Sequence, residues 1–336
     1  MNIIKTSLLT ATFALSTAFA AQASADTKKL CVFDPLGAAG DGFNMMKDYA
    51  IEMKAVGVDF EVKPYTDEGV AMADFLAKQC DTVAATGLRT RQYNKFAGSI
   101  SAVGALPSYD ELGTVLKTLS SKKASKYLNG DKFSIMGIFP LGAGYLFVND
   151  KGIDTVSELA GKRIATLNYQ KDAIHMVNYI NATVVPSDIT NFGGKFNNGS
   201  VDICYSPAFA FNAYELYHGL ENNGGIIRYP LAQLTMQLLT DTSSFDTATL
   251  QKSRDIAYSM YGKAMNLIEK HEKSIDEKYW VDIPASDIEL YQEMFRQNRL
   301  ELKASGVYDA NLLTLMRKIR CKTNGKASEC TRADKE

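Results

Sequence analysis

The chain has 336 residues, of which 46% are hydrophobic and 22% charged, as in a globular protein with a proper core. Its 37 basic and 38 acidic residues give a formal net charge of −1 at pH 7, so the overall charge gives no sign of a nucleic-acid partner or an anionic membrane surface. The length predicts about two domains.

The first 25 residues have the layout of a secretory signal peptide. Lys5 is followed by the uncharged apolar stretch "LLTATFALSTAFA", and residues 23–25 read Ala-Ser-Ala, a small-x-small cleavage site. We expect cleavage after Ala25 and a mature protein in the periplasm. No membrane anchor is expected, because no later apolar run approaches the roughly 20 residues that cross a bilayer.

Two stretches of the chain show the same order of predicted elements. The first contains strand 30–34, helix 42–57, strand 58–65, helix 67–79 and strand 81–87. The second contains strand 162–168, helix 170–180, strand 182–186, helix 187–198 and strand 201–207. Each order is βαβαβ, which makes the strands parallel and covers the sheet with helices. The sequence therefore predicts an α/β protein with two similar lobes.

Two apolar segments are expected to cross between these lobes. Residues 132–150 are rich in β-branched and aromatic residues, and Pro140, Gly142 and Gly144 predict two extended pieces with a break. Residues 224–241 have the same character and could carry the chain back. Two crossings near Pro140 and Pro230 would form a hinge.

The rest of the chain is predicted to be helical. Helices are expected within 246–275, 284–305 and 310–320. The expected division is lobe 1 at 26–138 with about 226–245, lobe 2 at 139–225, a helical segment at 246–320 that packs across the lobes, and a tail at 321–336.

Five cysteines lie in a chain expected outside the cytoplasm, where disulfides persist. Cys321 and Cys330 bracket the polar tail segment "KTNGKASE", and a bond between them would hold a tail that otherwise frays. Cys31 and Cys80 lie at or just before predicted strands and could pair if those strands are neighbours. Cys204 is interpreted as a small buried hydrophobic residue.

A glycine-rich turn, "FDPLGAAGDGF", follows the first predicted strand. Its glycines have the reverse of the G-x-G-x-x-G spacing of dinucleotide sites. The turn still lies at the carboxyl end of a strand and before a helix, where open α/β sheets place ligands and where backbone N–H groups suit an anionic or polar oxygen. We interpret residues 37–44, which are the end of this turn and the start of the helix, as one side of a ligand cleft, the alternative being a turn that only packs. Its candidate residues are Asp34, Gly37, Asp41 and Asn44.

A second candidate segment, "TGLRTRQY", follows the third strand of lobe 1. Its arginines and tyrosine could hold an anion or stack on a ring, although solvated surface arginines are equally common. The candidate residues are Thr86, Arg89, Arg91 and Tyr93.

Lobe 2 offers equivalent positions after its own strands. Asn168, Tyr169 and Gln170 open its first helix, and Tyr205 and Phe209 follow its last strand. The aromatic residues could form a wall with the amides as orienting groups. Phe209 fits a core position better than a cleft position.

The second lobe resembles the periplasmic solute-binding proteins of TRAP transporters, the DctP type. Residues typical of that family stand at Leu159, Gly161, Lys162, Pro186, Gly199, Val201 and Asp202. The whole sequence also resembles the proteins labelled AdeT, "RND-type efflux pump involved in aminoglycoside resistance". The resemblance implies a two-lobed, type II-like periplasmic binding fold that hands its solute to a membrane permease.

One family position differs in this chain. TRAP binding proteins usually carry an arginine after the G-x-K-I element, where it clamps the ligand carboxylate. That place falls near Ala165 here, and Arg163, two positions away, is the residue that could replace it.

The sequence shows no pattern of a catalytic or metal site. It has no H-E-x-x-H, no G-x-S-x-G and no P-loop, so we expect no enzyme activity, cofactor or metal. We expect a monomer that captures a small polar or anionic solute for a TRAP-like permease. One alternative is an accessory in aminoglycoside or multidrug resistance, with Asp34, Asp41 and Asp172 as partners for a cationic drug. The other is a periplasmic enzyme on the same bilobal fold.

Overall fold

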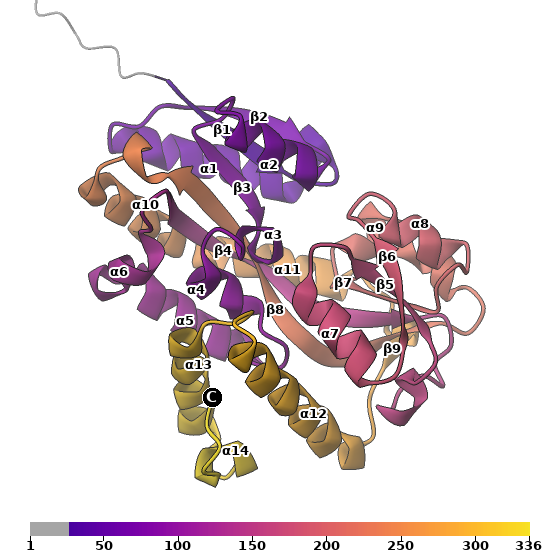
Figure 1. Ribbon diagram of the computed structural model, residues 1–336. Helices are drawn as coiled ribbons and strands as arrows, with labels where there is room; N and C mark the ends of the chain where they lie inside the picture. Colours follow the sequence, from indigo (N-terminus) through magenta and orange to yellow (C-terminus); the bar gives the residue numbers. More distant parts are fainter. Residues whose placement is uncertain (1–26) are drawn as a thin grey trace, which may run out of the picture.

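A single mixed β-sheet runs through both halves of the molecule in the computed structural model, which describes residues 27–336 (Figure 1). The expected signal peptide lies outside these residues. The strand order is β2-β1-β3-β8-β4-β7-β5-β6, and β9 pairs with β8. The strands are β1 (Lys28–Phe33), β2 (Phe60–Tyr65), β3 (Thr82–Thr86), β4 (Phe133–Val148), β5 (Arg163–Leu167), β6 (Thr183–Ser187), β7 (Ile203–Pro207), β8 (Gly225–Asp241) and β9 (Trp280–Val281).

Helices cover the sheet in each half, as the βαβαβ pattern predicts. They are α1 (Asp41–Ala55), α2 (Glu68–Leu76), α3 (Gly87–Thr90), α4 (Lys95–Gly98), α5 (Tyr109–Ser120), α6 (Ser125–Leu128), α7 (Lys171–Tyr179), α8 (Phe192–Asn197), α9 (Ala210–Ala213), α10 (Thr247–Ser259), α11 (Tyr261–Lys273), α12 (Ala285–Ala304), α13 (Ala310–Thr323) and α14 (Ser328–Thr331).

Lobe 1 is built on β1, β2 and β3, which pair in parallel. Side chains alternate along β1, so Leu30 and Val32 pack under α1 and α10 while Cys31 faces the core beneath α2 and α5. On α1, Met46, Tyr49 and Met53 recur at helical spacing and are buried. The predicted elements of this lobe are present, and the α/β class is confirmed.

Lobe 2 repeats the arrangement with β5, β6 and β7, again in parallel. Ile164 and Ile203 face α7 and α12, and Ala165 and Cys204 face α8 on the other side of the sheet. The expected helix 187–198 is shorter than predicted: its first residues form a turn in which Asp188 accepts hydrogen bonds from Thr190 and Asn191, and α8 begins at Phe192.

The two lobes are joined by β4 and β8, which run antiparallel to one another through both halves. β4 is one strand from Phe133 to Val148 rather than two pieces with a break. Proline and glycine instead shift its register against β8, between Pro140 and Gly142 and again between Gly144 and Leu146. These two irregularities interrupt the regular pairing of β4 with β8 where the chain passes between the lobes, and a further shift lies within lobe 1 between Ile135 and Gly137.

The C-terminal helices pack on both lobes. The long helix expected within 246–275 is divided at Met260 into α10 and α11, which both contact β4. α12 places Tyr291 and Phe295 in the lobe 2 core, whereas α13 places Leu312 and Met316 in the lobe 1 core. Within residues 27–336, no helix is long and apolar enough to cross a membrane.

Both predicted disulfides are confirmed. Cys31 on β1 bonds Cys80 just before β3, and Cys321 on α13 bonds Cys330 on α14. Cys204 is free, fully buried, and has a thiol pKa raised well above its usual value by that burial. It is therefore a core residue rather than a reactive thiol.

Candidate binding site between the lobes

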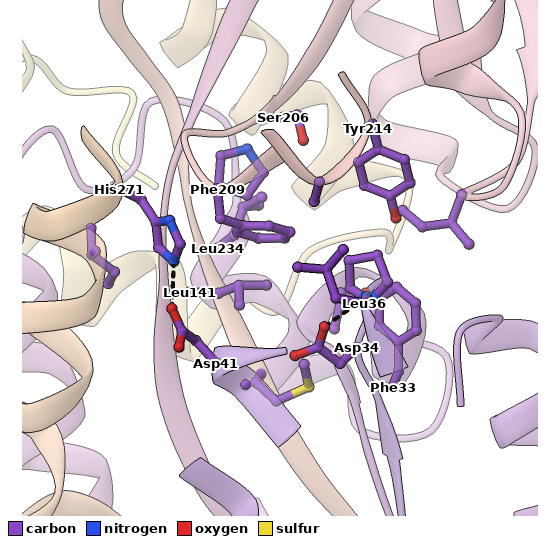
Figure 2. Close-up of a pocket in the computed structure, with 18 of the residues that line it drawn as sticks. Phe33, Asp34, Leu36, Asp41, Leu141, Ser206, Phe209, Tyr214, Leu234 and His271 are labelled. Atoms are coloured by element: carbon purple, nitrogen blue, oxygen red, sulfur yellow. Dashed lines mark hydrogen bonds and ion pairs between the residues drawn. The ribbon is translucent and has the colours of Figure 1, made fainter. Parts of the chain in front are cut away.

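A cavity of about 310 Å³ lies where the carboxyl ends of the strands of both lobes meet (Figure 2). β1 and β3 bring Phe33 and Thr86 to it, and β5 and β7 bring Leu167 and Pro207. The crossing strands and α11 complete its lining. Ligands of open α/β folds bind at such strand ends, and this volume is at the lower end of the range for small-molecule sites.

The glycine turn of lobe 1 is arranged around the side chain of Asp34, which is 7% exposed. Its two carboxylate oxygens accept hydrogen bonds from the backbone N–H groups of Leu36, at 2.9 Å, and Phe43, at 3.0 Å. A Cβ atom at Gly40 would lie 1.9 Å from the Asp34 carboxylate, so only glycine fits there. Burial raises the pKa of Asp34 although these N–H donors oppose the shift. The backbone donors that we expected to meet a ligand oxygen are thus occupied by Asp34.

Asp41, at the start of α1, lies at another edge of the same cavity. His271 Nε2 approaches its carboxylate to 3.2 Å and Lys270 Nζ to 3.4 Å. Both partners are on α11, which the sequence did not place near the glycine turn. Asp41 is therefore paired with the ammonium group of Lys270, whereas Asp34 has no lysine or arginine partner in the part of the chain that the structure describes.

Most of the lining is apolar. Phe33, Leu36 and Leu141 lie on one side in Figure 2, with Phe209 and Tyr214 opposite them. Among the residues of the described chain that line the cavity, none is lysine or arginine. Burial, together with the nearby carboxylates of Glu68 and Asp34, raises the pKa of Tyr214, so its hydroxyl remains a hydrogen-bond donor.

Arg89 does not line the cavity, because a buried carboxylate of its own lobe holds it. Glu68 on α2 is fully buried and accepts from Arg89 Nε at 3.2 Å. The same carboxylate oxygen accepts from the Tyr169 hydroxyl of lobe 2 at 3.0 Å, and the Arg89 guanidinium lies 3.6 Å from the centre of the Tyr169 ring. These three residues connect the lobes directly.

Arg91 makes a second connection between the lobes. Its Nη1 lies 2.6 Å from the carboxylate of Asp172 on α7, which is 5% exposed. The hydroxyl of Tyr308, before α13, donates to the same oxygen at 2.8 Å. We call Glu68, Arg89, Tyr169, Arg91, Asp172 and Tyr308 the interlobe latch.

Arg163 does not reach the cavity. It lies at the amino end of β5, the opposite end from the cavity, and pairs with Asp202 at 2.7 Å on the exposed edge. Arg163 and Ala165 are two residues apart on β5, so their side chains face the same side of the sheet. Arg163 nevertheless lies farther along the strand from the cavity than Ala165 does. Ala165 lines the cavity itself, so the small side chain leaves space where the family arginine is expected.

The remaining sequence candidates divide into two groups. Asp34, Asp41, Thr86, Tyr169, Tyr205 and Phe209 line the cavity. Gln170 accepts from the Tyr205 hydroxyl at 2.9 Å and faces a smaller neighbouring cavity of about 100 Å³.

Four further candidates line neither cavity. Gly37 has φ of +58° and shapes the turn, and Asn44 accepts from Lys47. Tyr93 packs edge-on against Phe133, and the backbone N–H of Asn168 donates to Ser187.

Sequence reasoning missed several lining residues. Leu36 and Tyr214 lie in segments that it did not assign to the cleft, and Ala264, Leu267 and Ile268 come from α11. The apolar spacing of α11 shows that one face is buried but not what it faces, so no local signal places it beside the glycine turn.

Comparisons with known proteins agree with this geometry. The family model described as "Solute-binding protein AdeT 1/2" matches residues 50–335. The "Probable solute-binding protein AdeT1" of Acinetobacter baumannii is 39% identical over 303 residues, covering 90% of this chain and all of that protein.

Two solved structures share the fold at low sequence identity. A TRAP periplasmic solute-binding protein from Desulfovibrio salexigens, solved with bound orotic acid, has a TM-score of 0.74 at 14% identity and covers 88% of this chain and 99% of that chain. The periplasmic ectoine-binding protein of the TeaABC TRAP transporter of Halomonas elongata has a TM-score of 0.71 at 14% identity, with the same coverage. The fold is therefore the two-lobed fold of TRAP binding proteins, and the chain belongs to the AdeT 1/2 solute-binding protein family.

Proposed function

We propose that this chain captures a small solute in the cavity between its lobes and presents it to a membrane transporter. The observation that carries the proposal is the position of the cavity, which is lined by the strand ends of both lobes, by the crossing strands and by α11. A solute held there contacts both lobes at once, so its binding favours the arrangement in which they are together.

The remaining parts of the proposal rest on the family and the fold. We propose that the protein acts by binding rather than by bond-making, as a periplasmic monomer whose signal peptide is removed after Ala25. The partner would be a permease of the TRAP kind, because the fold is shared with binding proteins of those transporters. Amino-terminal sequencing of the exported protein, with Asp26 expected first, tests the processing step.

A thermal-shift screen tests solute capture. Organic acids, amino acids, sugars, amines and aminoglycosides are added in turn, since a ligand of the native state raises the melting temperature in a concentration-dependent way. Leu36→Trp fills the cavity from an exposed turn, because Leu36 lines the cavity and yet is 54% exposed. Leu290→Trp on α12, where Leu290 is 58% exposed and outside the cavity lining, is the matched control.

The expected result is a shift in the wild type and in Leu290→Trp that is lost in Leu36→Trp. A solute that shifts all three proteins equally binds elsewhere and contradicts the proposal.

The role in aminoglycoside resistance comes from the label of related proteins. Asp34 and Asp41 do supply acidic groups to the cavity, but the surrounding aliphatic and aromatic side chains offer few partners for the hydroxyl groups of an aminoglycoside. We expect kanamycin to give no cavity-dependent shift in the same screen.

A further inference from the structure

The chemistry of the cavity indicates which class of solute it takes, and this inference rests on the proposed function. Three features that could bind an anionic solute are present in the sequence: the glycine turn, Arg89 with Arg91, and Arg163. In the structure, each of them already has a protein carboxylate as its partner.

The turn at the start of α1 is closed to a ligand anion by Asp34. Its carboxylate takes the N–H groups of Leu36 and Phe43, and the 1.9 Å approach to a Cβ at Gly40 shows that no space remains between the carboxylate and the backbone of the turn, although Asp34 still lines the cavity on its other side. A solute carboxylate at this end would have to displace Asp34 or lie against its negative charge.

The two arginines of lobe 1 are also already paired with buried carboxylates. Arg89 neutralises Glu68, which is fully buried, and Arg91 neutralises Asp172, which is 5% exposed. If either arginine turned toward a solute, it would leave a buried carboxylate without its counter-charge, which is strongly unfavourable.

Asp34 itself has backbone donors but no cationic partner. Within residues 27–336, the contacts of its carboxylate are with N–H groups, whereas Asp41 has both His271 and Lys270. The cavity thus contains one buried acidic group that has no cationic partner among the described residues and is surrounded by apolar side chains.

We propose that the cavity takes a solute with an apolar body and one protonated amine, the amine on Asp34 and the body against Leu36, Phe209, Tyr214 and Leu234. The amine supplies the positive charge that Asp34 lacks, and it replaces its lost water with a charge-assisted hydrogen bond. The apolar body fills the part of the cavity that offers no polar partners.

Three probes of one shape test this assignment: phenethylamine, phenethyl alcohol and phenylacetate, each titrated by calorimetry into the full mature chain. We expect the amine to bind at least about tenfold more tightly than the alcohol, and the carboxylate to bind more weakly than both. Asp34→Asn should remove most of the preference for the amine over the alcohol. Asp59→Asn, which removes an exposed acidic group paired with Lys54 outside the cavity lining, should preserve it.

The probe series on the wild type remains decisive if Asp34→Asn does not fold. Equal affinities, tighter binding of phenylacetate, or no binding by any probe would overturn the assignment. If phenylacetate binds the wild type and Leu290→Trp more tightly than phenethylamine does, and this binding is lost in Leu36→Trp, the amine class is wrong while solute capture in the cavity stands. If the amine binds Leu36→Trp as tightly as the wild type, its site is not this cavity.

Discussion

Gly40 and Asp34 fit together so closely that a single methyl group should disturb the cavity. Asp34 has a short side chain held by two backbone N–H groups, so it cannot rotate away from a Cβ at position 40 without losing them. We expect Gly40→Ala to lower the free energy of unfolding by about 1–3 kcal/mol, the usual cost of overpacking. Chemical denaturation measures this loss.

Gly194→Ala is the matched control. Gly194 lies in α8, and a Cβ there meets nothing within 4 Å, so alanine should leave stability unchanged or raise it by up to about 1 kcal/mol. Equal stability of the two variants would show that Asp34 is not held as described.

The Arg91–Asp172 pair provides a second prediction for a single residue. Arg91→Ala leaves a buried carboxylate of lobe 2 with only the Tyr308 hydroxyl on one oxygen, and its other oxygen already has no partner within the described chain. We expect a loss of about 3 kcal/mol or more in the free energy of unfolding, measured by urea denaturation.

Arg163→Ala removes the arginine of an exposed Arg–Asp pair and is expected to cost far less, because water screens the charges at that edge. If the two arginine variants are equally stable, the buried pair does not contribute to holding the lobes together.

Four of the candidate residues that line the cavity have places that follow from strand ends. Asp34, Thr86, Tyr169 and Tyr205 lie beside the carboxyl ends of β1, β3, β5 and β7, and that edge can be read from a βαβαβ pattern. The partners of the Arg89 side chain could not be predicted in this way. Its counter-charge lies 21 residues away, and the ring over which it stacks belongs to the other lobe.

At the scale of elements, periodicity identified most of the strands and helices, but not how they end. Residues 132–150 carry the right residues for a strand, and only pairing with β8 allows that strand to continue past Pro140 with a shifted register. Helices α3, α4, α6, α9 and α14 were not predicted, because each has only four residues and shows no period, and the longer α5 was also missed. The side chains of α11 that line the cavity are brought there by tertiary packing alone, so they could not be predicted from the sequence.

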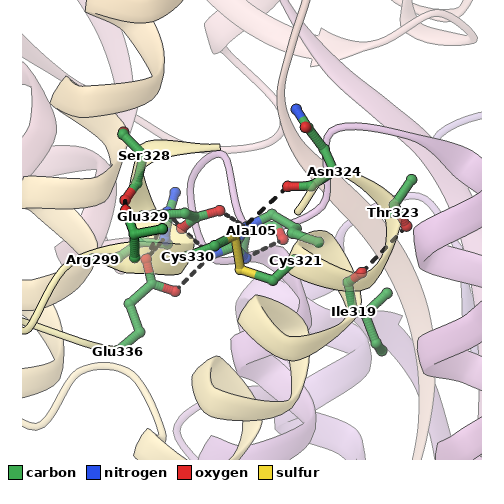
Figure 3. The surroundings of a disulfide bond; sticks show 12 residues. Ala105, Arg299, Ile319, Cys321, Thr323, Asn324, Ser328, Glu329, Cys330 and Glu336 are labelled. Carbon is green, nitrogen blue, oxygen red and sulfur yellow. Dashed lines mark hydrogen bonds and ion pairs between the residues drawn. A yellow bond between two sulfur atoms is a disulfide. The ribbon is translucent and has the colours of Figure 1, made fainter. Parts of the chain in front are cut away.

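The C-terminal tail is more firmly attached than its polar sequence indicates (Figure 3). The side chain of Glu336 is buried between Arg299 and Arg320, with oxygen-to-nitrogen distances of 2.6 and 2.8 Å, next to the Cys321–Cys330 disulfide. Burial raises the pKa of Glu336, but the two guanidinium groups outweigh it, so the pKa is below its ordinary value of 4.5.

Glu336→Gln should therefore destabilise the protein in a pH-dependent way. A depressed folded-state pKa contributes stability that is fully present above the unfolded value and is lost as the pH falls through the folded value. We expect a loss of about 3 kcal/mol at neutral pH, since two buried arginines are then left to share the single carboxylate of Glu329. Urea denaturation should show the gap to the wild type closing below pH 4.5. A gap that stays constant into acid would mean that the charge of Glu336 is not responsible.

At the scale of the whole molecule, the repeated βαβαβ order and the two apolar crossings were enough to predict two lobes with a cleft. The direct contact between the lobes was not predictable, because the latch combines α2, α7 and the segments after β3, β5 and α12. The latch also changes the free energy of closing the two lobes. Moving an equilibrium from mostly open to mostly closed takes about 5.5 kcal/mol of differential contact, and the latch supplies part of this without a solute.

Electron spin resonance distances between the lobes test the central claim most directly, which is that the lobes close on a solute in the cavity between them. Labels at Ile51→Cys on α1 and Tyr179→Cys on α7 are suitable, since both positions are exposed and the one free cysteine of the described chain is buried. We add the solute that gives the largest thermal shift. In the doubly labelled protein we predict that the distribution of label-to-label distances then narrows toward shorter values. In the doubly labelled protein that also carries Leu36→Trp, we predict no change. A distribution that is unchanged at saturating solute in the wild type would contradict the account.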